Sequence, residues 1–586
     1  MKRQDFYEGK AFDAYTYFGA HPQNGGIQFR TYAPQAQSIC VIGEWNHWQE
    51  EPMDQDAQSG IWQLFSRDAQ IGQMYKYVVY GANGRVEHCD PYGFGMELRP
   101  NFASIIRDIN AFVFTDETWM KQRTRNFDQP MNIYEMHLGS WEKNEKDENG
   151  WFTYDAIASD LIACCKENHF THVELMPLSE YPFDGSWGYQ TTGYFSPTSR
   201  YGTATQLQSL VNRLHNAGIG VIIDFVPAHF ATDSYGLKEF DGSQLYEYPT
   251  SDVGESEWGT CNFIYSRYEV RSFLQSAANY WLDKYHFDGI RMDAVSRLIY
   301  WMGDENRGVN PKAIDFLKQM NAGLHALHPS AMLIAEDSTA YPHVTKPVNE
   351  GGLGFDYKWD LGWMNDTLDY MMKTSDERKE LSGKLTFSMY YFYNERYLLP
   401  LSHDEVVHGK RTIVDKIYGT YEEKFAQLRS LYLYMMMHPG KKLNFMGNEI
   451  AMFREWDEEE ELDWFLLKYP MHDAFHHYFE TLGKIYQSTP QLYEWDDDPR
   501  SFEWITINDK QNNVYGFQRL AGTLKPVAAF FNFSNKTQTI HTEDKWVLRL
   551  HTDWECFNGT TKEKKEKKST DYFVLPPFSS IYVVME

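Results

Sequence analysis

The sequence predicts a multidomain protein of mixed α/β and β structure. A central (β/α)8 barrel of the TIM type would lie between an N-terminal β-sandwich and a C-terminal antiparallel β domain. At 586 residues the chain is too long for one compact domain. Its two ends carry short segments of alternating polar and apolar residues, whereas its middle alternates apolar runs with amphipathic stretches. We therefore expect three domains, at residues 1–110, 111–485 and 486–586.

The first domain is predicted from short alternating segments that are separated by glycine-rich turns. Residues 26–32 and 75–80 both alternate in the manner of half-buried strands. Strands of this length, joined by such turns, are typical of a small β-sandwich of roughly 80–100 residues.

The middle of the chain contains eight strand-like runs with helical stretches between them. Residues 206–216 and 270–285 have the amphipathic pattern of two such helices. Eight strand–helix units over roughly 350 residues fit a closed parallel barrel with insertions. The predicted strands are residues 132–137, 171–176, 220–225, 287–293, 331–336, 355–359, 397–403 and 443–447.

The alternating pattern returns after about residue 485. Residues 513–519, 527–532 and 572–584 predict strands of a C-terminal antiparallel β domain of about 100 residues. The run at residues 561–568 mixes lysines with glutamates, so we expect a solvated hairpin tip there and not a binding patch.

Composition restricts the partners and the compartment. The net charge of −27 argues against nucleic acid and anionic membranes, which require basic surfaces. Six scattered cysteines without a CxxC pair favour a reducing compartment. Because we find neither a secretory signal nor a membrane span, we expect a cytoplasmic protein. We also expect a monomer. The aromatic content of 16% suits a protein that stacks on sugars.

Four acidic residues lie at or just past the ends of predicted strands three, four, five and seven. They are Asp224, Asp293, Glu336 and Asp404. Active sites of such barrels lie at the carboxyl ends of the strands. Each carboxylate alone could be a helix cap or an ion-pair partner, but four at one rim predict a shared site. In strand four, Arg291 and Asp293 share one face, so the guanidinium would keep Asp293 ionised; a purely structural pair is the alternative.

Four sequence motifs then carry a resemblance. Residues 224–229 read DFVPAH, 289–293 GIRMD, 334–337 IAED and 401–405 LSHDE. In this order they resemble the α-amylase (glycoside hydrolase 13) family. Segments 134–141, 187–190, 404–408, 445–449 and 461–464 resemble the glucan branching enzymes of that family, and residues 42–48 resemble its glycogen-binding β-sandwich module. Asp337 stands where a second glutamate is expected, and Phe225 where tryptophan is common.

The resemblance implies an activity and a role for each site residue. The implied reaction is retaining cleavage of an α-1,4-glucan and transfer of the chain to a 6-hydroxyl, which forms an α-1,6 branch in glycogen. Asp293 would be the nucleophile and Glu336 the acid/base, about 5–5.5 Å apart, with Asp404 as the third catalytic carboxylate. Implied substrate-binding residues are Tyr189, Asp224, His229, Arg291 and His403. We find no loop spacing typical of a calcium or other metal site, and the chemistry requires no cofactor.

Two alternatives remain open at this point. The same carboxylates would make an α-glucan hydrolase, amylase-like or debranching, if water resolved the intermediate. A non-catalytic glucan-binding scaffold is the second alternative, but it would not need Asp293, Glu336 and Asp404 together. Whether the N-terminal module binds glucan is not decided by the sequence.

Overall fold

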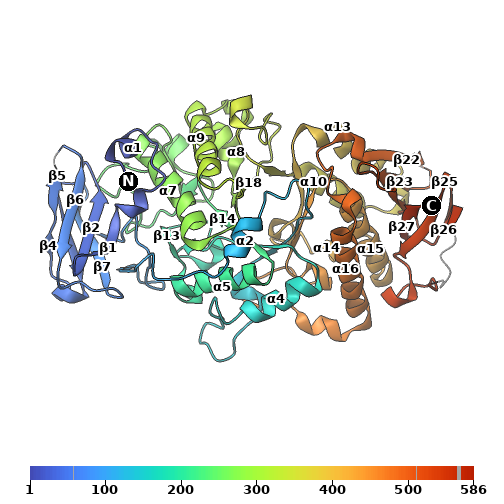
Figure 1. The fold of residues 1–586 in the computed structure, drawn as a ribbon, viewed down its shortest axis with the longest axis horizontal. Helices are drawn as coiled ribbons and strands as arrows, with labels where there is room; N and C mark the ends of the chain where they lie inside the picture. The colour runs from blue at the N-terminus through green and yellow to red at the C-terminus, as the bar shows by residue number, and fades with distance from the viewer. Residues whose placement is uncertain (57, 510, 564–568) are drawn as a thin grey trace.

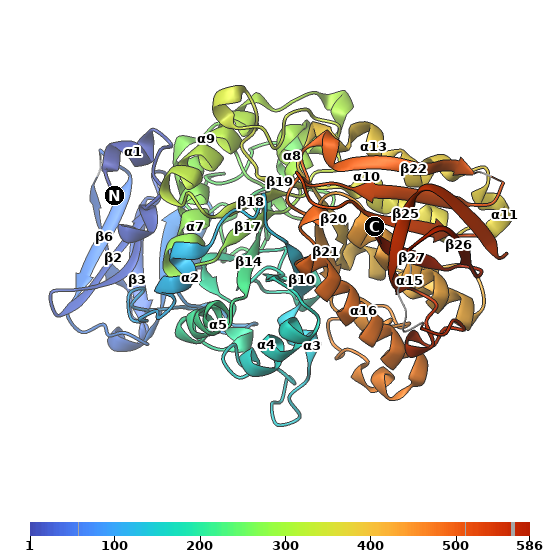
Figure 2. The ribbon, with the colours of Figure 1, turned by 45° about the vertical axis from the view of Figure 1, so that its right-hand side comes forward.

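The three predicted parts lie side by side along the molecule (Figure 1). The computed structural model describes residues 1–586 except for 57, 510 and 564–568. Most of the predicted hairpin tip at residues 561–568 therefore lies outside the described residues. The N-terminal strands occupy one end, the barrel the middle and the C-terminal sheet the other end, also when the molecule is turned (Figure 2). In the described part of the chain, no helix has the length and apolar character needed to cross a bilayer.

The N-terminal part is a β-sandwich, as predicted. One sheet has the order β1-β2-β6-β5; the other has the order β4-β3-β7-β8, with β9 also pairing with β7. A short helix, α1 (Arg3–Tyr7), precedes the strands and packs against the barrel helix α7. The strands are β1 (Gly19–Gln23), β2 (Gly26–Tyr32), β3 (Ser38–Gly43), β4 (Glu51–Pro52), β5 (Asp54–Asp56), β6 (Ile61–Ser66), β7 (Met74–Gly81), β8 (Gly84–His88) and β9 (Ser104–Ile105).

The central barrel is closed and parallel, and each of its strands falls within or beside a predicted one. The order is β10-β11-β14-β17-β18-β19-β20-β21, and β21 closes the ring by pairing with β10. Nearly every strand residue is buried, which explains why these strands read as apolar runs. The bounds are β10 (Asn132–Met136), β11 (His172–Leu175), β14 (Gly220–Phe225), β17 (Gly289–Met292), β18 (Met332–Ala335), β19 (Tyr357–Trp359), β20 (Tyr397–Leu401) and β21 (Lys441–Phe445).

Helices cover the barrel, but the expectation of eight strand–helix units is wrong at one place. Residues 336–356, all of them described, connect β18 to β19 and contain no α-helix, only the 3-10 turn η7 (Val348–Glu350). Pro342, Pro347 and the glycines at 351, 352 and 354 explain this, because both residue types disfavour a helix. The main covering helices are α4 (Ala158–Glu167), α5 (Ala204–Asn216), α7 (Tyr268–Tyr285), α9 (Pro311–Leu327), α10 (Leu361–Met371), α15 (Tyr421–Met437) and α16 (Pro470–Ser488).

The C-terminal part is one antiparallel sheet, as predicted, in the order β22-β23-β24-β27-β25-β26. It packs on α15 through β24 and β27, and the Ser430 and Ser580 hydroxyls are 2.9 Å apart across that contact. The strands are β22 (Phe502–Asp509), β23 (Val514–Arg519), β24 (Val527–Asn532), β25 (Gln538–His551), β26 (Ser569–Leu575) and β27 (Ser580–Met585).

Candidate active site

The predicted site residues meet at the carboxyl ends of the barrel strands. Asp224 is the penultimate residue of β14, Asp293 and Glu336 directly follow β17 and β18, and Asp404 lies three residues beyond β20. A cavity of about 590 Å³ opens at this rim. Six of the eight predicted site residues line it: Tyr189, His229, Asp293, Glu336, His403 and Asp404. Asp224 and Arg291 lie buried beneath its floor, each with 1% of its side chain exposed.

Arg291 connects the acidic residues. Its Nη1 donates to Asp224 Oδ1 and to Asp293 Oδ1, both at 2.8 Å, and its Nη2 lies 3.9 Å from Glu336 Oε2. The predicted contact between Arg291 and Asp293 is therefore confirmed. The guanidinium also lies 4.4 Å from the ring centre of Trp359 inside the barrel, which fixes its plane.

The two candidate catalytic carboxyls have raised pKa values. Burial raises the pKa of Asp293 to about 6, against the opposing charge of Arg291 and with the support of Asp224 and Asp404. Burial also raises the pKa of Glu336 to about 7, where Arg291 again opposes and Asp293 adds to the shift. Glu336 Oε2 accepts the Ala294 N–H at 2.6 Å. That N–H is available because the chain turns sharply at Ala294, which has a φ of 50°.

His403 is held in its charged form by a residue from the opposite end of the barrel sequence. Its Nδ1 donates to Glu135 Oε1 at 2.6 Å, and its backbone N–H donates to Glu135 Oε2 at 3.0 Å. Burial would lower the pKa of His403, but Glu135 and Asp404 outweigh it and raise the pKa to about 9. His403 Nε2 lies 3.6 Å from Asp404 Oδ1, and this cation lowers the pKa of Asp404, whose side chain is 56% exposed. The rim therefore presents an imidazolium beside an open carboxylate.

Tyr189 and His229 complete the cavity wall. The Tyr189 hydroxyl donates to Asp224 Oδ2 at 2.5 Å, and its ring stacks on His403 at 5.7 Å between ring centres. Burial, aided by the charge of Arg297, lowers the pKa of His229 to about 4, so this imidazole is neutral near pH 7. Its Nδ1 is buried and has no hydrogen-bond partner among the described residues. The His229 ring also lines the cavity, where a ligand can contact it.

Family models match almost the whole chain. Residues 17–93 match carbohydrate-binding module 48 (isoamylase N-terminal domain). Residues 118–251 and 258–543 match the alpha amylase catalytic domain, and residues 504–586 match the alpha amylase C-terminal all-beta domain.

Curated relatives narrow the family further. The 1,4-alpha-glucan branching enzyme GlgB of Bacillus caldolyticus is 46% identical over 524 residues, which cover 88% of this chain and 78% of the relative. GlgB of Fusobacterium nucleatum is 44% identical over 579 residues, which cover 97% of this chain and 94% of the relative. The chain belongs to the 1,4-α-glucan branching enzymes of the α-amylase family.

Solved structures of more distant proteins share the fold of this branching-enzyme chain. Pullulanase type I from Bacillus subtilis, complexed with maltose, aligns with a TM-score of 0.76 at 17% identity, over 97% of this chain and 85% of the pullulanase. A pullulanase from Bacillus acidopullulyticus aligns with a TM-score of 0.75 at 17% identity, over 97% and 74%. At such identities the likeness concerns the fold alone.

Sequence reasoning missed several residues around the site. Glu135 was not assigned a role, and Glu174 on β11 is buried in the barrel with both carboxylate oxygens unpartnered among the described residues. A charged residue inside an otherwise apolar strand was the signal that could have identified both. Trp187 and Trp258 also line the cavity. Trp187 lies in the motif at residues 187–190 but was given no role, and Trp258 lies in a loop that carries no comparable signal. In the described part of the chain no group of three or more His, Cys, Asp or Glu side chains is arranged to hold a metal ion.

Proposed function

We propose that this protein branches α-1,4-glucan: it cleaves an α-1,4 linkage with retention and transfers the released chain to a 6-hydroxyl of a glucan. The observation that supports this most strongly is the pair Asp293 and Glu336. Both carboxyls have raised pKa values and flank one buried guanidinium, in a chain 46% identical to a curated branching enzyme.

In the first step Asp293 attacks the anomeric carbon, and Glu336 gives its proton to the departing glycosidic oxygen. The bond to the leaving chain breaks as the bond to Asp293 forms, which leaves a covalent glycosyl-enzyme. In the second step Glu336 takes the proton of an incoming 6-hydroxyl, whose oxygen displaces Asp293. Two inversions give net retention, and the new linkage is α-1,6.

The surroundings of the two carboxyls support this division of roles. Burial raises the pKa of Glu336, which favours the protonated form that the acid role needs, and the hydrogen bond and charge of Arg291 oppose the rise at Asp293 and favour its ionised form. Arg291 donates to Asp293 and fixes the direction of the attacking carboxylate.

The remaining side chains suit sugar binding. We assign hydroxyl contacts to the charged His403, to Asp404 as the third catalytic carboxylate, and to the neutral His229. The Tyr189 ring would stack on the sugar at the cleaved position, oriented by its bond to Asp224.

The decisive experiment is to incubate the protein with linear amylose and to measure reducing ends and α-1,6 linkages together. New α-1,6 linkages with few free reducing ends support the branching transferase. Rising reducing ends without α-1,6 linkages would show a hydrolase, the alternative in which water resolves the intermediate. No change in either quantity would show a glucan-binding scaffold.

We also propose that the protein acts as a cytoplasmic monomer on α-1,4-glucans such as amylose and glycogen. It would need neither a nucleic acid nor a membrane partner. Domain limits at residues 110 and 485 stay predictions, and helix α16 spans the second of them. Gel filtration with light scattering would test the oligomeric state.

A further inference from the structure

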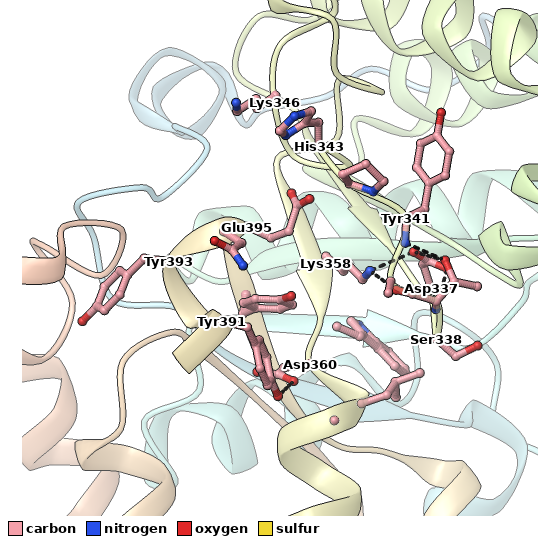
Figure 3. Close-up of a pocket in the computed structure, with 18 of the residues that line it drawn as sticks. Asp337, Ser338, Tyr341, His343, Lys346, Lys358, Asp360, Tyr391, Tyr393 and Glu395 are labelled. Atoms are coloured by element: carbon pink, nitrogen blue, oxygen red, sulfur yellow. Dashed lines mark hydrogen bonds and ion pairs between the residues drawn. The ribbon is translucent and has the colours of Figure 1, made fainter. Parts of the chain in front are cut away.

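A second cavity, of about 620 Å³, lies between the connection from β18 to β19, the end of β19 and the segment before β20 (Figure 3). Residues on β19 show its position. The Trp359 ring contacts Arg291, so the neighbouring side chain of Lys358 in β19 points to the other face of the strand, because side chains alternate along a strand. Trp359 itself also contributes to the cavity lining. Both Lys358 and Asp360 line this cavity. We call it the outer cavity; its main lining residues are Asp337, Lys358, Asp360, Phe387, Tyr391 and Tyr397.

One side of the outer cavity carries a row of aromatic rings. The ring centres of Phe387 and Tyr391 are 5.7 Å apart, and those of Tyr391 and Tyr397 are also 5.7 Å apart. Phe387 is 54% exposed, so it offers an open ring to a ligand. The neighbouring rings are tilted by 67° and 76° to each other, so they form a stepped aromatic wall in which the exposed face of Phe387 is the one that suits the apolar face of a sugar.

Hydrogen-bonding groups accompany the rings. Lys358 Nζ lies 2.8 Å from Asp337 Oδ2, and the Tyr391 hydroxyl donates to Asp360 Oδ1 at 2.8 Å, as Figure 3 shows. The lining contains more acidic than basic side chains, since Asp366 and Glu395 add to these two aspartates. This disfavours an anionic ligand such as a phosphate and favours a neutral polyhydroxylated one.

The outer cavity is formed before any ligand arrives. Glu395 accepts the N–H groups of Val344 at 2.9 Å and Thr345 at 2.7 Å, which ties the β18–β19 connection to the segment before β20. A preformed site does not spend binding energy on ordering this loop.

The outer cavity adjoins the active site. Ser338, two residues after Glu336, lines both cavities. A branching reaction needs two glucan segments at once, because a sugar hydroxyl and not water must reach the glycosyl-enzyme beside Glu336. We propose that the outer cavity binds the acceptor α-1,4-glucan chain. This assignment rests on the proposed branching function, and it deepens it by giving the second substrate a site.

The test compares two aromatic residues that are truncated to alanine: Phe387, which directly precedes the short helix α13 (Ser388–Tyr391), and Tyr390 within that helix. Phe387→Ala removes an exposed ring that lines the outer cavity; Tyr390→Ala removes a ring that is 83% exposed and does not line it. Amylose serves as donor, and a linear maltodextrin labelled at its reducing end serves as acceptor. The measured quantities are α-1,6 linkages on the labelled chain, as a function of its concentration, and free reducing ends.

We expect Phe387→Ala to raise the KM for the labelled acceptor about 5–10-fold, because an exposed stacking face is lost. Reducing ends should rise relative to α-1,6 linkages as water competes for the intermediate. Tyr390→Ala should leave both quantities near those of the unaltered protein. Equal acceptor KM values for the two variants would overturn the proposal. If the unaltered protein formed no α-1,6 linkages at all, the branching function itself would fail, and the acceptor role with it.

A binding measurement checks the same site without catalysis. Calorimetry with the unlabelled maltodextrin would use Asp293→Ala alone and Asp293→Ala combined with Phe387→Ala. Weaker binding by the double variant supports glucan in the outer cavity; identical isotherms contradict it.

Discussion

Strand β17 has an aspartate at each end, and the two carboxylates lie in opposite environments. Asp288 precedes the strand and accepts from Trp119 Nε1, His215 Nε2 and the Val221 N–H, at 2.7–2.8 Å, with Arg123 at 3.2 Å. Although burial would raise its pKa, His215 and Arg123 lower the pKa well below the usual range. Asp293 follows the same strand, has its ion pair with Arg291, and has a raised pKa.

The difference between these two environments separates a cluster of side chains that stabilises the fold from the carboxyl-end rim, where the polar groups are not all paired. At the amino end of the strands, the side chains around Asp288 satisfy each other, and ionisation there is favourable. At the carboxyl end, His229 Nδ1 and both oxygens of Glu174 have no hydrogen-bond partner among the described residues. Buried polar groups without a partner lower stability, and natural proteins accept this cost mainly at functional sites.

The largest effect is expected from Asp293→Asn. Activity should fall by about 10⁴-fold or more because the nucleophile is lost. The midpoint of thermal unfolding should stay unchanged or rise, since a carboxylate whose charged form is disfavoured by burial becomes neutral. Branching rates and melting curves of the two proteins would be compared. Substantial remaining turnover would contradict the assignment of Asp293.

The opposite result is expected from Asp288→Asn at the other end of the strand. Removal of one charge from a buried, hydrogen-bonded cluster should lower the free energy of unfolding by about 3–5 kcal/mol. At a temperature where the variant is folded, the activity should change little, because Asp288 is not at the rim. Urea denaturation and an assay at reduced temperature measure the two quantities. A large loss of kcat in the folded variant would show that Asp288 affects catalysis as well as stability, so that the two ends of β17 do not have separate roles.

The pH dependence of stability should distinguish the same cluster. His215 donates to Asp116 and Asp288 at 2.8 Å each, and these carboxylates outweigh burial and raise its pKa to about 9. Because the folded pKa lies above the unfolded value, the stabilisation is complete below about pH 6.5 and is lost as the pH rises through 9. The expected loss is about 3 kcal/mol.

His403 titrates in the same range, so a control is required. His215→Gln should be less stable than the unaltered protein below pH 6.5 and should lose less stability between pH 6.5 and 9. Urea midpoints at several pH values would show this. If the urea midpoints of the two proteins changed with pH in parallel, His215 would be excluded as a source of the pH dependence of stability.

A smaller effect is expected from Glu135→Gln, which acts on the site through His403. The kcat/KM should fall about tenfold, because a neutral amide no longer supports the imidazolium. The pKa of His403 should fall from about 9 toward its ordinary value, which NMR titration of labelled histidines can follow. A tenfold loss of activity with an unchanged His403 pKa would indicate a merely structural role for Glu135.

The sequence predicted the elements whose signal is local. Each barrel strand is an apolar run because it is buried on both faces, and Asp293 and Glu336 could be placed because they directly follow such runs. The contact between Glu135 and His403 joins residues 268 positions apart. The local sequence marks Glu135 as unusual, but it does not show which residue Glu135 pairs with. Pro342, Pro347 and the following glycines disfavour a helix after β18. The prediction of eight strand–helix units counted only the strands and therefore did not use this signal. The connection without this helix contributes residues 337–343 and Lys346 to the lining of the outer cavity.

The smallest effect is expected from Glu174→Gln, and it sharpens the comparison with Asp288→Asn. Burial and the neighbouring Glu135 hold the pKa of Glu174 well above its usual range, which favours the uncharged form of this carboxyl. A neutral amide of the same shape should therefore change the free energy of unfolding by less than about 1 kcal/mol. Glu174→Asp, which shortens the side chain and leaves space in the barrel, serves as the packing control. Urea denaturation at pH 7 measures both variants. If Glu174→Gln lowered the free energy of unfolding as much as Asp288→Asn does, Glu174 would have to be ionised. The carboxyl end of the strands would then stabilise buried charge as the amino end does.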